Sequence, residues 1–175
     1  MKPSEKGFTL LELLVSLAII PLVALSASAT MFQISKSTDR NRDYMTAVRQ
    51  VQNAGYWISR DAQMANSITT NTTLPDFLTI GWTEWNWPSG AIYHYDRYFF
   101  EGLTSEGIGT LKRNHLSSAG ENQTTLIATG IYYESTDNNT SKASYQSPVL
   151  TVQLTAVSGK TRETREYKIK RRPNL

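Results

Sequence analysis

The N-terminal part of the chain begins with a long run of apolar and small residues. It extends from Phe8 to Phe32, a length of 25 residues, and Glu12 is its only charged side chain. About 20 apolar residues are enough to span a bilayer as a helix. We therefore expect residues 8–32 to form a membrane-spanning helix. Within this helix Pro21 removes one backbone hydrogen bond, which membrane helices tolerate, and predicts a kink or a melted turn.

Beyond Phe32 the pattern becomes amphipathic. Apolar and small residues recur at alternating spacings of four and three, which places them on one face of a helix. We therefore expect one helix from about Phe8 to about Ala65, whose second half lays this stripe on a globular domain. Arg60 and Asp61 fall off the stripe, and a solvated helix charge is one interpretation of each. The stripe consists of Tyr44, Val48, Val51, Gly55, Ile58, Ala62 and Ala65.

After Asn66 the composition changes to Thr, Asn and Pro, followed by short β-like segments separated by turn signals. Such spacing, without a second long helical pattern, indicates an antiparallel sheet, and one of its faces should pack on the helix stripe. The fold class is therefore α+β. The polar stretch Ser135–Ser147 is expected to be a surface loop. The expected strands are Phe77–Trp82, Ala91–Phe100, Ile108–His115, Thr124–Glu134, Val149–Val157 and Thr164–Arg171.

The acid in the apolar run points to a function. A carboxylate costs about 2.5–3.5 kcal/mol at the centre of a membrane, and less near its edge, so Glu12 should have a role that requires it. The segment Lys6–Leu13, which reads Lys-Gly-Phe-Thr-Leu-Leu-Glu-Leu, resembles the cleavage and methylation signal of type IV prepilins. The resemblance implies that prepilin peptidase cuts between Gly7 and Phe8 and that Phe8 becomes the N-methylated end. It also implies that Glu12 aligns subunits by meeting the amine of a neighbour.

The resemblance implies a pilin-like plan, with one long N-terminal helix packed on an antiparallel sheet. It divides the chain into a leader at 1–7, a membrane and filament-core helix at 8–32, an amphipathic continuation at 33–66 and an extracytoplasmic sheet domain at 67–175. The leader would lie in the cytoplasm, and the sheet domain would lie outside the cytoplasmic membrane, in a periplasmic or extracellular filament after assembly. The implied partners are prepilin peptidase, other pilin or pseudopilin subunits, an inner-membrane assembly platform and membrane lipid.

A second resemblance lies at the end of the helix. Ile58–Ala65, with its Arg60-Asp61 pair, is similar to the helix ending of J-type minor pseudopilins and related minor pilins. Those chains tend to continue with a Tyr-rich strand, a Leu-x-Arg strand and an arginine-bearing last strand, which Ile92–Tyr95, Leu111–Arg113 and Tyr167–Arg171 match loosely. We therefore expect a minor subunit of a type IV pilus-like filament or of a type II secretion pseudopilus.

Two other functions stay open at this point. The first is a signal-anchored extracytoplasmic binding domain that does not polymerise, for which residues 1–7 would be retained. The second is a subunit of a DNA-uptake or adhesive pilus. An ordinary signal peptide cleaved near Ala27-Ser28-Ala29 fits poorly, because the apolar run exceeds the 7–15 residues, roughly, that such signals use.

The residue types disfavour an enzyme. The chain has no Cys, so disulfides, thiolate metal sites and thiol nucleophiles are excluded. Its two histidines are His94 and His115. On a strand His94 and Asp96 share a face but lie about 6–7 Å apart along it, and no nucleophile is evident beside them. We expect satisfied histidines, no catalytic residues, no cofactor and no metal, and we expect Asp137-Asn138-Asn139 to form a turn rather than a calcium loop.

Two surface features are candidates for partner contacts. Trp85 and Trp87 fall in an expected loop and are the aromatic residues that we assign to partner contact. The basic C-terminal group is expected to protect an edge strand rather than to bind DNA, because the net charge of +3 is small for a nucleic-acid binder. The other aromatic residues of the central cluster are expected mostly in the core; they are Trp82, Tyr93, Tyr95, Tyr98, Phe99 and Phe100, while the basic group is Lys168, Lys170, Arg171 and Arg172.

Overall fold

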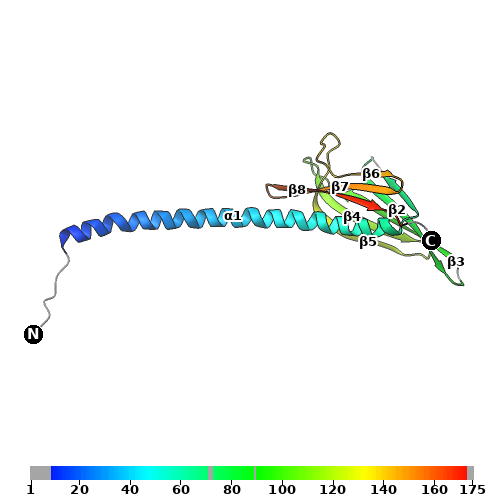
Figure 1. Ribbon diagram of the computed structural model, residues 1–175, viewed down its shortest axis with the longest axis horizontal. Coiled ribbons are helices and arrows are strands. Elements are labelled where there is room, and N and C mark those ends of the chain that lie inside the picture. The colour runs from blue at the N-terminus through cyan, green and yellow to red at the C-terminus, as the bar shows by residue number, and fades with distance from the viewer. Residues whose placement is uncertain (1–8, 71–72, 89, 173–175) are drawn as a thin grey trace, which may run out of the picture. The chain divides into compact units, whose positions relative to one another are not determined.

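The structure is a computed structural model that describes residues 9–70, 73–88 and 90–172. It contains one long helix, α1, followed in the described residues by eight strands (Figure 1). The chain divides into two structural units, Met1–Asn41 and Arg42–Leu175. The elements are α1 (Leu10–Met64), β1 (Ser67–Thr70), β2 (Asp76–Asn86), β3 (Gly90–Glu101), β4 (Ile108–Ser117), β5 (Asn122–Tyr132), β6 (Lys142–Gln146), β7 (Val149–Ser158) and β8 (Thr161–Lys170).

The first unit is the N-terminal part of α1. By length and composition this helix contains a stretch that is apolar enough to cross a membrane, and none of that stretch is buried in the structure. The helix runs without a break through Pro21, so the expected melted turn is absent. Proline removes only one hydrogen bond of the helical ladder, and the bonds on either side keep the helix intact.

In the second unit the C-terminal part of α1 buries one face against the sheet. The predicted stripe is confirmed from Val48 onward, but Tyr44 is wrong, because its side chain is 43% exposed. The buried face also includes a second row of residues, Ala47, Ala54 and Asp61, which the stripe omitted. The buried residues of α1 are Ala47, Val48, Val51, Ala54, Gly55, Ile58, Asp61 and Ala62.

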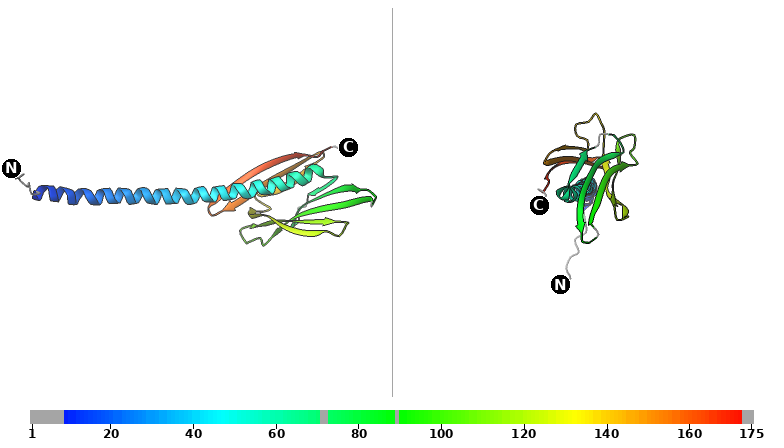
Figure 2. Two further views of the ribbon diagram at one scale, coloured as in Figure 1. Left: turned by 90° about the horizontal axis from the view of Figure 1, so that it is seen from below. Right: turned by 90° about the vertical axis from the view of Figure 1, so that its right-hand side faces the viewer.

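The strands form one antiparallel sheet in the order β1-β2-β3-β4-β5-β7-β6, and β8 pairs with the other side of β7. The two ends of this order, β1 and β6, approach each other, so the sheet is curled. Figure 2 shows the strands curving around α1, which supplies the centre of the core. This arrangement confirms the predicted α+β class and the pilin-like packing of a long helix on an antiparallel sheet.

The six expected strands are present with shifted ends, and two further strands were missed. β1 is short and polar, and β6 lies inside the stretch Ser135–Ser147 that was expected to be a loop. That expectation is wrong for β6, because Ala143 and Tyr145 alternate with its polar residues and pack against the core. A five-residue strand gives only two apolar positions, too few to distinguish it from a loop by periodicity.

Candidate functional site

The start of α1 is fixed by two side chains that bond to each other's backbone. The Thr9 N–H and the Thr9 hydroxyl donate to Glu12 Oε2 at 2.9 and 2.8 Å, and the Glu12 N–H donates to Thr9 Oγ1 at 3.3 Å. This is a capping box, in which two otherwise unpaired groups of the first turn satisfy each other. Glu12 therefore has a local structural role, as a helix cap, in addition to the role expected for it in assembly.

The other predicted residues of the N-terminal site, Gly7 and Phe8, lie outside the described residues. The two predicted contact residues are exposed, with Trp85 at 70% and Trp87 at 82%. Trp87 lies in the turn after β2, as expected, but Trp85 lies in β2 itself, opposite Ala91 of β3. β2 and β3 extend further than predicted, and the hairpin that they form carries both indoles.

A group of charged and polar side chains is buried between α1 and the sheet. Arg113 of β4 donates from Nε to Asp61 Oδ2 at 2.7 Å and from Nη2 to Asp96 Oδ2 at 2.6 Å. The Tyr98 hydroxyl donates to the same Asp61 oxygen at 2.5 Å. Asp61, Asp96 and Tyr98 are each 0% exposed. We call Asp61, Asp96, Tyr98 and Arg113 the buried charge network.

Burial and charge shift the protonation equilibria of this network. Burial raises the pKa of Asp96 to about 6, and the Asp61 charge adds to the rise, while His115 and Arg113 oppose it. Burial and Asp61 raise the pKa of Tyr98 well above its usual value. Burial is the largest influence on the pKa of Arg113 and lowers it, but the hydrogen bond to Asp61 and the charges of Asp61 and Asp96 together outweigh burial and raise that pKa. The guanidinium therefore stays charged, and the Tyr98 phenol stays protonated.

Asp61 overturns one expectation. It was expected to lie off the buried stripe, with a solvated helix charge as one interpretation, yet it is fully buried. The side chain of its neighbour Arg60 is 44% exposed and lies 4.2 Å from the centroid of the Trp57 ring. The signal was present in the sequence, because Asp61 extends the row Ala47, Val51, Ala54 and Ile58 with the same alternation of four and three. An acid on that row could have been recognised as buried and in need of a cation.

The two histidines lie side by side on β3 and β4. Trp82 stacks on His94 with ring centroids 5.1 Å apart, and His94 lies 5.4 Å from His115. His115 is directly opposite Asp96 in the strand register, and its Nδ1 is 2.8 Å from Asp96 Oδ1. Asp96 therefore pairs across the strands with His115 rather than along its own strand with His94.

His94 was expected to have hydrogen-bond partners, but it has none among the described residues. It is 8% exposed, and neither ring nitrogen makes a hydrogen bond to the described part of the chain. Glu84 Oε2 is 3.3 Å from Nε2, but the pair lacks hydrogen-bond geometry. On the other ring, His115 Nε2 is 3.4 Å from Glu121 Oε2.

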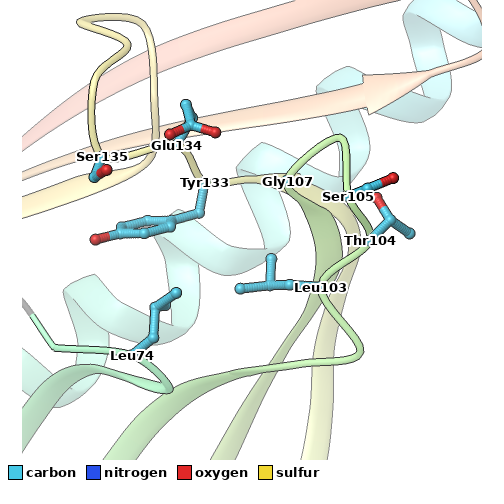
Figure 3. Close-up of a pocket in the computed structure, with 8 residues that line it drawn as sticks. All are labelled: Leu74, Leu103, Thr104, Ser105, Gly107, Tyr133, Glu134 and Ser135. Atoms are coloured by element: carbon cyan, nitrogen blue, oxygen red, sulfur yellow. The ribbon is translucent and has the colours of Figure 1, made fainter.

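The Asp96–His115 pair does not form a hydrolytic triad in the described residues. The second nitrogen of His115 faces the Glu121 carboxylate, not a hydroxyl, so no nucleophile is positioned to be activated. A separate pocket of about 220 Å³ lies between the loop after β3 and the chain after β5 (Figure 3). Glu134 is its only charged lining residue, and no histidine or lysine lines it. Its titratable lining residues are Tyr133 and Glu134.

The predicted edge strand and turn are both observed. Among the described residues β8 pairs only with β7, and its Lys168 is exposed beside Glu166. Just beyond β8, Arg171 donates to the Asn66 carbonyl at 2.7 Å, which ties the chain to the end of α1. The Asn139 N–H donates to Asp137 Oδ1 at 2.8 Å, which is the bonding of a turn.

The N-terminal segment is the part of the chain that matches a known protein family. Residues 2–28 match the family model described as the prokaryotic N-terminal methylation motif. The search among curated proteins found no match, and neither did the search among solved structures. The matched segment contains the Thr9–Glu12 capping box and most of the apolar half of α1.

Proposed function

We propose that this chain, a type IV prepilin-like protein, is a minor structural subunit of a type IV pilus-like filament or of a type II secretion pseudopilus. The observation that carries the proposal is the methylation motif at residues 2–28, which contains the only acid of the apolar helix. In this proposal prepilin peptidase removes residues 1–7, Phe8 is methylated, and residues 8–32 hold the subunit in the membrane before assembly. Residues 33–66 continue the helix, and residues 67–175 form the extracytoplasmic domain.

The apolar half of α1 suits transfer from lipid into a filament. Its large apolar side chains are exposed all around the helix, including Leu10 at 83% and Phe32 at 71%. A helix that is apolar on every side needs either lipid or other helices around it. Exchange of lipid contacts for helix contacts keeps these side chains away from water, so assembly need not be steeply uphill.

Glu12 can cap its own helix and still align a neighbour. Both hydrogen bonds from Thr9 go to Oε2, and Oε1 receives none from residues 9–70, 73–88 or 90–172. In our proposal the amine of the Phe8 end of an adjacent subunit approaches this second oxygen. Each charge is costly in an apolar environment, and pairing neutralises both.

The buried charge network supports the minor-subunit assignment. The weaker resemblance to J-type minor pseudopilins rested on the helix ending at Arg60-Asp61 and on a Leu-x-Arg strand. Asp61 and Arg113 are hydrogen-bonded to each other, so two of the resembling segments form one structural feature. The exposed Trp85 and Trp87 are the side chains that we propose for contact with a sister subunit.

Two substitutions of Glu12 separate its role as a helix cap from its role as a charge that aligns a neighbouring subunit. Glu12→Gln keeps a side-chain oxygen for the capping box but removes the charge, whereas Glu12→Val removes both. A charged hydrogen bond contributes about 1.5–3 kcal/mol, so we expect both variants to reduce incorporation into sheared filaments by roughly 10- to 150-fold. The control is Glu106→Gln, which removes one exposed carboxylate after β3 and should assemble normally.

Two results would contradict the proposal at different points. If Glu12→Gln assembled like the wild type while Glu12→Val did not, Glu12 would act through its cap alone. Mass spectrometry of the N-terminus tests the pathway itself, for which we expect a chain that starts at N-methylated Phe8. A mature chain that retained Met1 would instead indicate an anchored domain that does not polymerise.

A further inference from the structure

We propose that His94, His115 and Glu121 form a binding site for a divalent transition-metal ion of the Zn²⁺ type. One ring nitrogen of each histidine and one carboxylate oxygen of Glu121 lie within 4.8 Å of one another. Two imidazoles and a carboxylate are ligands that zinc commonly takes, and the imidazoles favour such a metal over calcium or magnesium. The proposal is independent of the role in filament assembly.

His115 is already oriented as a metal ligand. Its Nδ1 is held by the buried carboxylate of Asp96 at 2.8 Å, which leaves Nε2 for a metal. A carboxylate behind a ligating histidine fixes the tautomer and the direction of the ring. His115 Nε2 lies 3.4 Å from Glu121 Oε2. Two ligands at zinc bond lengths and a tetrahedral angle are separated by about the same distance, roughly 3.4 Å.

His94 supplies the observation that calls for a ligand. It is more than nine-tenths buried, and both of its ring nitrogens lack a hydrogen bond in the part of the chain that the structure describes. A buried polar group without a partner costs about 1–3 kcal/mol. A bound metal would satisfy one of the two nitrogens.

The stacking of the rings defines what must move. The planes of His94 and His115 are inclined by only 21°, and a ligating lone pair lies in the plane of its ring. These rings are stacked on each other rather than coplanar, so their lone pairs lie in separate planes and cannot both point at one ion. One ring must therefore turn when the metal binds. His94 is that ring, because it has no hydrogen bond to lose, whereas His115 is held by Asp96.

The ligands would join separate parts of the sheet. His94 lies on β3 and His115 on β4, while Glu121 lies in the turn that leads to β5. A metal bound to all three would cross-link β3, β4 and this turn. Because a ligand that binds only the folded state stabilises it, metal binding should raise the unfolding temperature of the sheet domain.

The test is a zinc titration of the full-length protein in detergent micelles after treatment with a chelator. A chromophoric chelator competes for Zn²⁺, and tryptophan fluorescence follows thermal unfolding. We expect one zinc ion per chain and a rise in unfolding temperature with Zn²⁺ but not with Ca²⁺. Loss of a supporting carboxylate behind a histidine weakens metal binding by about 10- to 100-fold, and loss of a direct ligand should matter at least as much.

Glu121→Gln is the decisive variant, because the exposed fraction of the Glu121 side chain is 65% and its replacement should leave folding intact. We expect it to weaken zinc binding at least about tenfold, whereas the control Glu106→Gln should bind like the wild type. His94→Gln should abolish the zinc-dependent rise in unfolding temperature. Absence of zinc binding by the wild type would overturn the proposal. Equal binding by the wild type and Glu121→Gln would also overturn it, and the rings would then be aromatic packing only.

Discussion

Replacement of Arg113 by methionine tests the buried charge network most directly. Methionine keeps a long, flexible side chain at this position but removes the charge and all donors. The substitution takes away the hydrogen bonds from Nε to Asp61 and from Nη2 to Asp96. Both carboxylates are fully buried, so water cannot replace the lost donors without opening the contact between α1 and the sheet.

The expected loss is large compared with the stability of a domain. Removal of one partner from a buried ion pair costs about 3–5 kcal/mol, because it leaves an uncompensated buried charge. Arg113→Met leaves two such charges, and these also repel each other, while Tyr98 and His115 each keep one hydrogen bond to them. We therefore expect a decrease of about 3–5 kcal/mol in a free energy of unfolding that is typically about 5–15 kcal/mol.

The assay is denaturant unfolding of the full-length protein in micelles, followed by tryptophan fluorescence. All four tryptophans lie in the unit Arg42–Leu175, so the signal reports on the sheet and the helix packed against it. The matched control is Arg97→Met on β3. Arg97 pairs with Asp76, but both side chains are at least a third exposed, and such a pair contributes about 0–1 kcal/mol. If the two variants differed by less than about 1 kcal/mol, the network would not stabilise the fold as argued.

Two further predictions use the same assay. Tyr98→Phe should lower the free energy of unfolding by about 1.5–3 kcal/mol, because Asp61 loses a charged hydrogen bond. Because the pKa of Tyr98 is raised in the folded state, the stabilisation by its hydroxyl is complete below pH 10 and is progressively lost above it. The difference in free energy of unfolding between the wild type and Tyr98→Phe should therefore narrow by up to about 1.4 kcal/mol per pH unit above 10. A difference that stayed constant with pH would contradict the raised pKa. Gly55→Ala should destabilise the protein by about 1–3 kcal/mol, because the new Cβ would overlap the Tyr167 ring, although helix propensity alone predicts a gain in stability of about 0.8–1.0 kcal/mol. The double variant Gly55→Ala with Tyr167→Leu should recover most of the lost stability. If Gly55→Ala alone were more stable than the wild type, helix propensity would dominate over the overlap.

The elements in which a hydrophobic period repeats many times were predictable from the sequence. A stripe with alternating spacings of four and three identified the half of α1 that packs on the sheet, and alternation identified β7 and β8. β6 was missed because its apolar positions are only Ala143 and Tyr145 within a polar stretch. Periodicity assigns a face to each residue but does not show how far a neighbouring element covers that face, which is why Tyr44 was misplaced.

The polar sites were less predictable than the elements, because they depend on strand register. His94 and Asp96 are two residues apart, so the sequence suggested a relation along β3. The observed partner of Asp96 is His115, which is opposite it on β4. Likewise Asp61 meets Arg113 across 52 positions of the chain. These pairs become visible only when the strands are aligned, and no local motif encodes that alignment.

Glu12 and Asp61 pose the same physical problem in the same helix. Each is an acid at a position where the surroundings favour an apolar side chain, and a charge there needs compensation. Asp61 is compensated within the chain by Arg113 and Tyr98, so its role is to hold α1 on the sheet. Glu12 has only the neutral donors of Thr9 among the described residues. A carboxylate that is capped but not neutralised is the one that gains free energy from a cation on another molecule, which is the reason to seek the assembly contact at Glu12 and not at Asp61.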